Sequence, residues 1–134
     1  RTRWYHDSVA IERGPLVYGL DIGERWEPFR EAGGVKDYCV YPETPWNYAL
    51  DEEGAIEAEE GEVSATPFAK SHPPVKLKTR GKRLEGWILE GGNAGDLPQS
   101  PVAAPDALEE DVRLIPFGCT KLRISQFPCY ISKP

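Results

Sequence analysis

The chain has 134 residues, which is enough for one domain, residues 1–134, with a single modest hydrophobic core. Apolar residues make up 40% of it and charged residues 28%, a composition typical of a globular chain rather than a disordered one. The net charge of −6 argues against a nucleic-acid partner, whose phosphates attract basic surfaces. No apolar run is long enough to cross a membrane, so we expect no membrane partner either.

Residues 8–22 carry the longest apolar stretch, and we expect the rest of the chain to pack on it or pair with it. Apolar residues recur at alternate positions over 9–11 and 16–22, which is typical of half-buried strands. Gly14 and Pro15 interrupt the pattern, because proline fixes φ and cannot donate to a β-ladder. The stretch is therefore either two strands joined at a corner or one strand broken by a bulge.

The next segments are shorter and more polar. Residues 24–34 are polar and glycine-rich, with Trp26 and Phe29 as candidate anchors. Residues 37–41 are expected to form a short strand that ends at a proline. Residues 51–62 contain the only helix signal in the chain, but glycines weaken it and an acidic loop fits as well.

Basic and apolar residues alternate along residues 75–84. One face carries Val75, Leu77 and Thr79, and the other carries Lys76, Lys78 and Arg80. The pattern predicts an amphipathic strand at a sheet edge, where lysines discourage edge-to-edge pairing. A solvated face accounts for these charges better than a binding role does. A brief extended piece is expected at 66–69.

The C-terminal part of the chain is first irregular and then strand-like. Residues 91–108 form a long loop rich in glycine, proline and small residues, and such loops are usually functional or packed on another domain. Within it, we expect residues 93–102 to be an ordered, non-helical surface segment that faces a neighbouring domain or covers a sheet edge. Residues 111–118 and 121–127 are expected to pair as a hairpin or an angled pair of strands.

Short strands separated by glycine and proline, of which there are 13 each, predict an all-β fold, an antiparallel β-sandwich of jelly-roll-like form. The expected core comes largely from apolar residues near both ends of the chain: Val9, Ile11, Leu16, Tyr18, Leu20, Leu114, Ile124 and Phe127. Because the chain begins with Arg1 and contains no methionine, we expect it to be a fragment of a larger multidomain protein.

Three cysteines, Cys39, Cys119 and Cys129, show no spacing typical of a metal site. The two histidines, His6 and His72, form no recognisable pattern with them that would activate a nucleophile. We therefore expect the cysteines to be small buried hydrophobes or to form a disulfide. The sequence predicts no metal or other cofactor in this chain.

Four segments occur in an order that resembles a known enzyme family. They are VAIERGPLVY at 9–18, PWNYAL at 45–50, LPQSPV at 97–102 and LIPFGCTKLRISQFP at 114–128. Together they resemble the C-terminal part of glycoside hydrolase family 127, the β-L-arabinofuranosidase-like proteins. The resemblance covers most of the chain.

In such proteins an (α/α)6 barrel carries the chemistry and β-sandwich domains follow it. The family's catalytic pattern resembles a zinc site built from a glutamate and cysteines, one of which is the nucleophile, and nothing in this chain matches it. The resemblance implies a non-catalytic accessory domain whose partner is the catalytic barrel of the same parent chain, with any zinc held by that barrel. It leaves the compartment open, since a bacterial parent in the periplasm or in the cytoplasm fits equally.

A carbohydrate-binding module is the alternative function. Its candidate residues are Trp46, Tyr48 and Trp87, with Trp26 as a further ring, because aromatic side chains stack on sugar faces. Core packing is the commoner role of large aromatic residues, and we favour it for each ring. The two interpretations differ in exposure, because a binding platform needs exposed rings with polar partners nearby.

An autonomous glycosidase is the least favoured hypothesis. It would need a pair of positioned carboxylates, for which Glu12, Asp21 and the acidic run at 51–60 are available. Acidic residues outside a pocket are usually solvated surface groups, so we expect no hydrolase activity from this chain.

Overall fold

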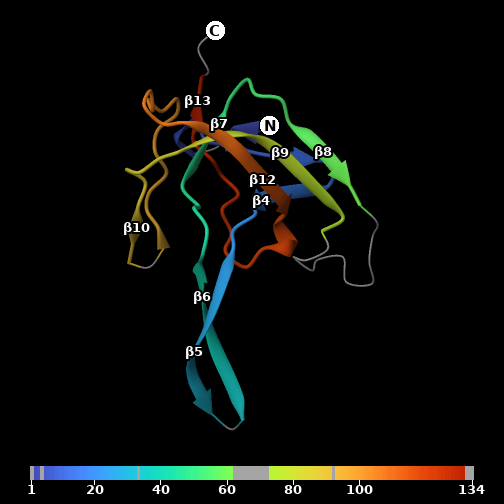
Figure 1. Ribbon diagram of the computed structural model, residues 1–134, viewed down its shortest axis with the longest axis vertical. Helices are drawn as coiled ribbons and strands as arrows, with labels where there is room; N and C mark the ends of the chain where they lie inside the picture. Colours follow the sequence, from blue (N-terminus) through green and yellow to red (C-terminus); the bar gives the residue numbers. More distant parts are fainter. Residues whose placement is uncertain (1, 4, 33, 62–72, 92, 132–134) are drawn as a thin grey trace.

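The computed structural model is an all-β structure, as predicted (Figure 1). It describes residues 2–3, 5–32, 34–61, 73–91 and 93–131. Strands account for 48% of the chain, and the largest sheet, mostly antiparallel, curls into a half-barrel. Within these ranges there is no α-helix and therefore no helix able to cross a membrane. Two short 3-10 helices occur, η1 (Tyr5–Asp7) and η2 (Phe117–Cys119). The extended piece expected at 66–69 lies outside the described residues.

The apolar N-terminal stretch forms strands joined by a tight turn. β3 (Glu12–Arg13) and β4 (Leu16–Leu20) pair antiparallel through a two-residue loop made of Gly14 and Pro15. Gly14 has a φ of 59°, the positive value that the first position of a type II′ turn requires. Of the two alternatives for this stretch, two strands joined at a turn is confirmed. Just before it, β2 (Val9–Ala10) pairs with β1 (Thr2–Arg3).

Seven strands form the largest sheet. Its spatial order is β13 (Cys129–Tyr130), β7 (Tyr48–Asp51), β9 (Val75–Arg83), β12 (Glu109–Pro116), β4 and β3, with β8 (Glu57–Glu60) paired to the first half of β9. Only the pair between β13 and β7 is parallel. Leu114 is aligned with Leu20 on one side and with Leu77 on the other, so three buried leucines lie side by side across this sheet.

The interior position of β9 shows that the predicted sheet edge is wrong. Its basic side chains face solvent, as the alternation predicts, but acidic residues lie beside them on both neighbouring strands. Lys78 is aligned with Glu57 of β8, and its Nζ lies 3.7 Å from the carboxylate of Asp111 on β12. Arg80 Nε lies 3.1 Å from the carboxylate of Glu109. The acidic segment predicted as a helix or loop contributes β8 instead, because cross-strand pairs of opposite charge favour the sheet.

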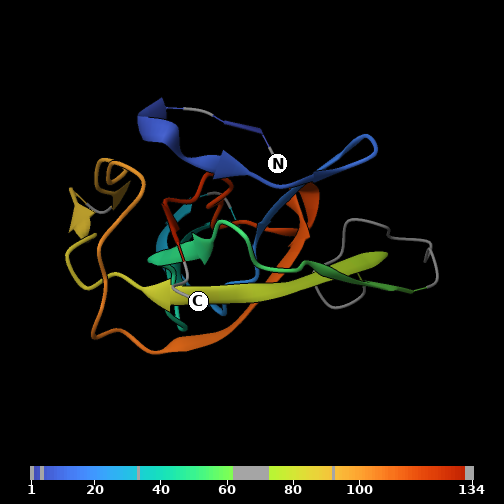
Figure 2. The same cartoon turned by 90° about the horizontal axis from the view of Figure 1, so that it is seen from above.

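The core lies on the inner face of the curled sheet, and the predicted core is confirmed. Six of the eight predicted residues are at most 2% exposed, and Leu16 and Ile124 are partly buried against them. Seen from above, the N-terminal strands and β9 lie on opposite sides of the C-terminal segment (Figure 2). The apolar residues of that segment therefore close the core between the two.

Residues 121–127 do not pair with β12, so the predicted hairpin is wrong. After η2 the chain runs back beside β4, where the amide of Leu20 donates to the carbonyl of Ile124 at 2.8 Å. Phe127 and Val9 then exchange two backbone hydrogen bonds, at 2.8 and 2.9 Å, before the chain enters β13. The segment satisfies its backbone groups against the N-terminal strands, which lie far from it in sequence.

A long two-stranded hairpin projects from the body of the molecule (Figure 1). It consists of β5 (Glu24–Ala32) and β6 (Val35–Pro42), and we call it the hairpin arm. The short strand expected at 37–41 is confirmed within β6, and most of the polar segment at 24–34, for which the sequence predicts no element, is also strand. The pairing register shifts between Pro28 and Arg30, which fits the inability of proline to continue a ladder.

Candidate functional site

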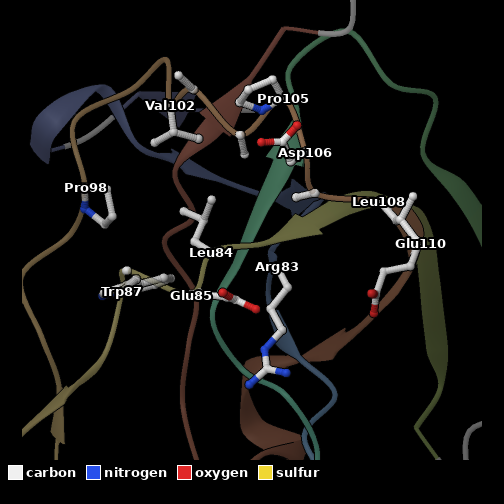
Figure 3. Close-up of a pocket in the computed structure, with 14 residues that line it drawn as sticks. Arg83, Leu84, Glu85, Trp87, Pro98, Val102, Pro105, Asp106, Leu108 and Glu110 are labelled. Carbon is white, nitrogen blue, oxygen red and sulfur yellow. The ribbon is translucent and has the colours of Figure 1, made fainter.

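A cleft lies at the C-terminal end of β9, between that strand end and the loop that leads into β12 (Figure 3). It is lined by residues 83–87, 98, 102–108 and 110, and we call it the β9 cleft. Its volume is about 740 Å³, in the range of pockets that hold small molecules. The loop was predicted at 91–108; its first residues belong to a small hairpin in which β10 (Leu89–Glu90), just before the loop, pairs with β11 (Asn93–Ala94), and the loop is irregular after that.

The cleft begins where the apolar inner face of the sheet ends. Tyr48 is aligned with Arg83, and Glu110 with Gly81, so these four residues lie on one face of three adjacent strands. Because Gly81 has no side chain, the hydroxyl of Tyr48 reaches across β9 and donates a short hydrogen bond to Glu110 Oε1. A Cβ at position 81 would lie 2.6 Å from a methyl group of Val112, which leaves no room for a larger residue.

Asn47 holds the chain at one side of the cleft and orients an arginine. Its Nδ2 donates to the carbonyl oxygens of Leu84, at 2.6 Å, and Trp87, at 3.1 Å. Its Oδ1 accepts a hydrogen bond from Arg83 Nε at 3.1 Å. The buried amide therefore fixes the turn after β9 and the base of the guanidinium group, whose terminal nitrogens have no hydrogen-bond partner among the described residues.

Three carboxylates share the cleft with Arg83, namely those of Glu85, Asp106 and Glu110 (Figure 3). Glu85 and Asp106 are exposed and make no hydrogen bond or ion pair within the described part of the chain. Glu110 accepts the hydrogen bond from Tyr48. Burial, and then this hydrogen bond, raise the pKa of Tyr48 to about 12, so its phenol stays a proton donor at neutral pH.

The floor of the cleft is apolar. Leu84, Pro98 and Val102 line it as partly buried side chains, and Trp87, which also lines the cleft, is 4% exposed. The indole Nε1–H of Trp87 donates to the carbonyl of Gly95 at 2.9 Å, so the polar edge of the ring is satisfied inside the protein. The cleft thus combines an apolar floor with charged groups around it.

The structure brings the predicted carbohydrate-binding residues into packed rather than exposed positions. Tyr48 is 7% exposed, Trp87 is 4% exposed, and Trp46 is half-buried. Trp46 and Trp87 meet edge to face, with ring centroids 5.1 Å apart. Because stacking on a sugar needs an open ring face, Tyr48 and Trp87 provide no such platform here, and core packing accounts for them.

The loop beside the cleft is anchored to both ends of the chain. His6 Nδ1 donates to the carbonyl of Leu97 at 2.6 Å, and the amide of Ser100 donates to the carbonyl of His6 at 2.9 Å. The amide of Cys129 donates to Ser100 Oγ at 2.9 Å, and the carbonyl of Cys129 accepts from the amide of Val102 at 2.8 Å. The predicted segment 93–102 is non-helical, and its last residues, Ser100 and Val102, bond to Cys129 of the edge strand β13. This agrees with the interpretation that the segment covers a sheet edge. A contact with a neighbouring domain stays a prediction.

The hairpin arm carries a second candidate surface. Trp26 is aligned with Val40, and Pro28 with Tyr38, so these four residues lie on one face of the arm. Trp26 is 49% exposed and Tyr38 is 47% exposed, and their rings meet edge to face at 6.0 Å. Trp26 was a candidate anchor; instead it is about half exposed, and its strand belongs to the arm.

The opposite face of the arm is polar. Arg25 Nε lies 3.2 Å from the carboxylate of Glu27, and the guanidinium of Arg25 lies 5.1 Å from the ring centre of Tyr41. The arm therefore has one face with apolar and aromatic side chains and one face with ionic contacts.

Comparisons with protein-family models, with curated proteins and with solved structures found no match for this chain. Sequence analysis did not single out Arg83, Glu85, Asp106 or Glu110. The one signal for the cleft was the long loop at 91–108, which predicted a functional or packed segment but not the strand end it faces.

The three cysteines are free, so the disulfide alternative is wrong in this structure. Cys119 and Cys129 are buried, as expected for small hydrophobes, and burial raises the pKa of the Cys119 thiol. Among the described residues, no group of three or more His, Cys, Asp or Glu side chains is placed to hold a metal ion. Glu12 and Asp21 are exposed, and neither lines the β9 cleft.

Proposed function

We propose that this chain is a non-catalytic accessory domain of a glycoside-hydrolase-like protein and that it packs against the catalytic (α/α)6 barrel of the same parent chain. The proposal starts from the four segments that resemble β-L-arabinofuranosidase-like proteins. The observation that carries it is the uncovered apolar face of the hairpin arm, formed by Trp26, Pro28, Tyr38 and Val40.

The arm has the features of an interface element. A two-stranded hairpin is at best marginally stable in water, and this one has no further strand beside it among the described residues. Aromatic side chains are enriched at protein interfaces, whereas here they face solvent on a projecting hairpin. A neighbouring domain that covers this face would bury Trp26 and Tyr38 and would stabilise the arm.

The cysteine chemistry of the chain supports an accessory role. A nucleophilic cysteine needs a lowered pKa and access to substrate, but burial raises the pKa of Cys119 and Cys129 is fully buried. Cys39 lies on the arm, where it is partly exposed and aligned with Glu27, and among the described residues it has no histidine beside it in the register of the arm. We therefore expect the catalytic groups to lie in the barrel of the proposed parent chain.

The test uses the full-length protein and compares the two faces of the arm. Replacing Trp26 and Tyr38 together by lysine is expected to lower the thermal stability of the full-length protein and to raise hydrogen exchange over 24–42. The control is Tyr41→Lys, an exposed aromatic residue on the opposite face, which is expected to change neither. Equal effects from the two faces, or no effect from either, would show that the apolar face is not the domain interface.

A further inference from the structure

We propose that the β9 cleft binds one ring of a neutral sugar, through charged groups and an apolar floor rather than through an aromatic platform. This goes beyond the accessory role, because docking through the hairpin arm makes no use of the cleft. The observation that carries it is that Arg83, Glu85, Asp106 and Glu110 line one cleft together with Leu84, Pro98 and Val102, in a volume of about 740 Å³ (Figure 3).

The mixture of charges selects the class of ligand. Three carboxylates and one guanidinium give the lining a net charge of −2, which disfavours phosphates, sulfates and sugar acids. Arg83 in turn disfavours a simple cation, because Asn47 holds its Nε in place and a cation offers no acceptor to its terminal nitrogens, which have no hydrogen-bond partner among the described residues. A hydroxyl group both donates and accepts, so neighbouring hydroxyls on one ring can pair with a carboxylate and a guanidinium together.

The remaining features fit a ring with one apolar face. Small-ligand sites are mostly apolar with a few placed polar groups, and the C–H face of a sugar ring can lie on the floor formed by Leu84, Pro98 and Val102. The hydrogen bond from Tyr48 holds Glu110, and the contact from Asn47 holds Arg83. Two of the polar groups are therefore positioned before any ligand arrives.

The experiment titrates the isotope-labelled 134-residue chain with one ring in three charge states and follows backbone amide shifts by NMR. The probes are D-galactose, D-galacturonate and D-galactosamine, together with D-glucose and D-xylose as further neutral rings. We expect saturable shifts at residues 83–87 and 98–108 with at least one neutral sugar. D-galacturonate should bind about tenfold more weakly than D-galactose or not at all, as expected when a carboxylate meets a cleft of the same sign.

Two isosteric variants test the polar groups. Glu85→Gln and Asp106→Asn should keep the shape and the fold of the protein, because neither carboxylate has a partner among the described residues. Each substitution should weaken sugar binding about tenfold, because it removes a carboxylate that would accept a hydrogen bond from a sugar hydroxyl. Glu12→Gln, an exposed carboxylate on β3 outside the cleft, is the matched control and should leave binding unchanged.

Three results would overturn the proposal. The first is the absence of saturable shifts with every neutral sugar. The second is sugar-induced shifts that lie outside the cleft, on the hairpin arm for example. The third is tighter binding of D-galactosamine than of any neutral ring, which would make the cleft a cation site. The first and third results leave the hairpin arm as a domain interface untouched, and failure of the hairpin-arm test leaves the β9 cleft untouched, so the two proposals can be told apart when one of them fails.

Discussion

The indole Nε1–H of Trp87 donates a hydrogen bond to the carbonyl oxygen of Gly95 at 2.9 Å, across the base of the hairpin formed by β10 and β11. Trp87 also meets the ring of Trp46 edge to face. One side chain therefore links the floor of the β9 cleft to the small hairpin that begins its loop and to the segment before β7.

Trp87→Phe is expected to lower the free energy of unfolding by about 1–3 kcal/mol, because it removes the hydrogen bond to Gly95 and leaves a void beside Trp46. Urea denaturation followed by circular dichroism measures this change. The same substitution at Trp26, which is 49% exposed, is the control and should cost less than about 0.5 kcal/mol. Similar losses at the two positions would contradict the buried role of Trp87.

Gly81→Ala is expected to destabilise the protein by about 1–3 kcal/mol or more, since the added Cβ would stand 2.6 Å from Val112 Cγ2 and 2.9 Å from the carbonyl of Ala49. Gly86→Ala is the matched control. Nothing lies within 4 Å of its added Cβ and its φ is not left-handed, so the change should be neutral or slightly stabilising. Thermal unfolding of the two variants separates these outcomes, and a neutral Gly81→Ala would mean that the strands around β9 are less tightly packed.

Alternation in the sequence predicted the apolar strands and the core correctly, because a strand that is buried on one face has an apolar residue at every second position. Val9, Tyr18 and Leu114 could be placed in this way. This alternation does not show which strands are neighbours in the sheet. β9 was placed at an edge because its lysines face outward, whereas Glu57 and Asp111 on its two neighbours explain that charge.

The first strand of the hairpin arm, β5, and the cleft were missed for a related reason. Residues 24–34 are polar and glycine-rich and show no alternation, so only backbone pairing with β6 makes β5 a strand. The cleft joins Arg83 to Asp106 and Glu110, which follow it after a long irregular segment. No local spacing rule relates such residues, because their proximity depends on how the loop folds back over the end of β9.

Ser100→Ala is expected to lower the free energy of unfolding by about 1–3 kcal/mol, because the buried amide of Cys129 loses its acceptor. Hydrogen exchange should also become faster at Cys129 and Val102, whose backbone groups pair beside the lost contact. The neighbouring Gln99→Ala removes an exposed side chain that bonds Asp7 and should change stability by less than about 0.5 kcal/mol. Unchanged exchange at Cys129 in the Ser100 variant would contradict this role of the serine hydroxyl.

The pH dependence of stability should report the hydrogen bond between Tyr48 and Glu110. Burial, and then this bond, raise the pKa of Tyr48 to about 12 in the folded state, whereas an unfolded tyrosine titrates near 10. The unfolded chain therefore loses the proton first. The stability that Tyr48 contributes is fully present below about pH 10 and is lost as the pH rises through its folded pKa.

At pH 7, Tyr48→Phe should be less stable than the wild type by about 1 kcal/mol, since the hydrogen bond is gone. Between about pH 9.5 and 11.5 the wild type should lose about 1–2 kcal/mol relative to the variant, because only the wild type has the phenol to ionise, so the difference should fall to zero or change sign. Urea titrations of both proteins across this range measure the difference while changes common to both cancel. A difference that stays constant with pH would mean that Tyr48 is not held protonated by its surroundings.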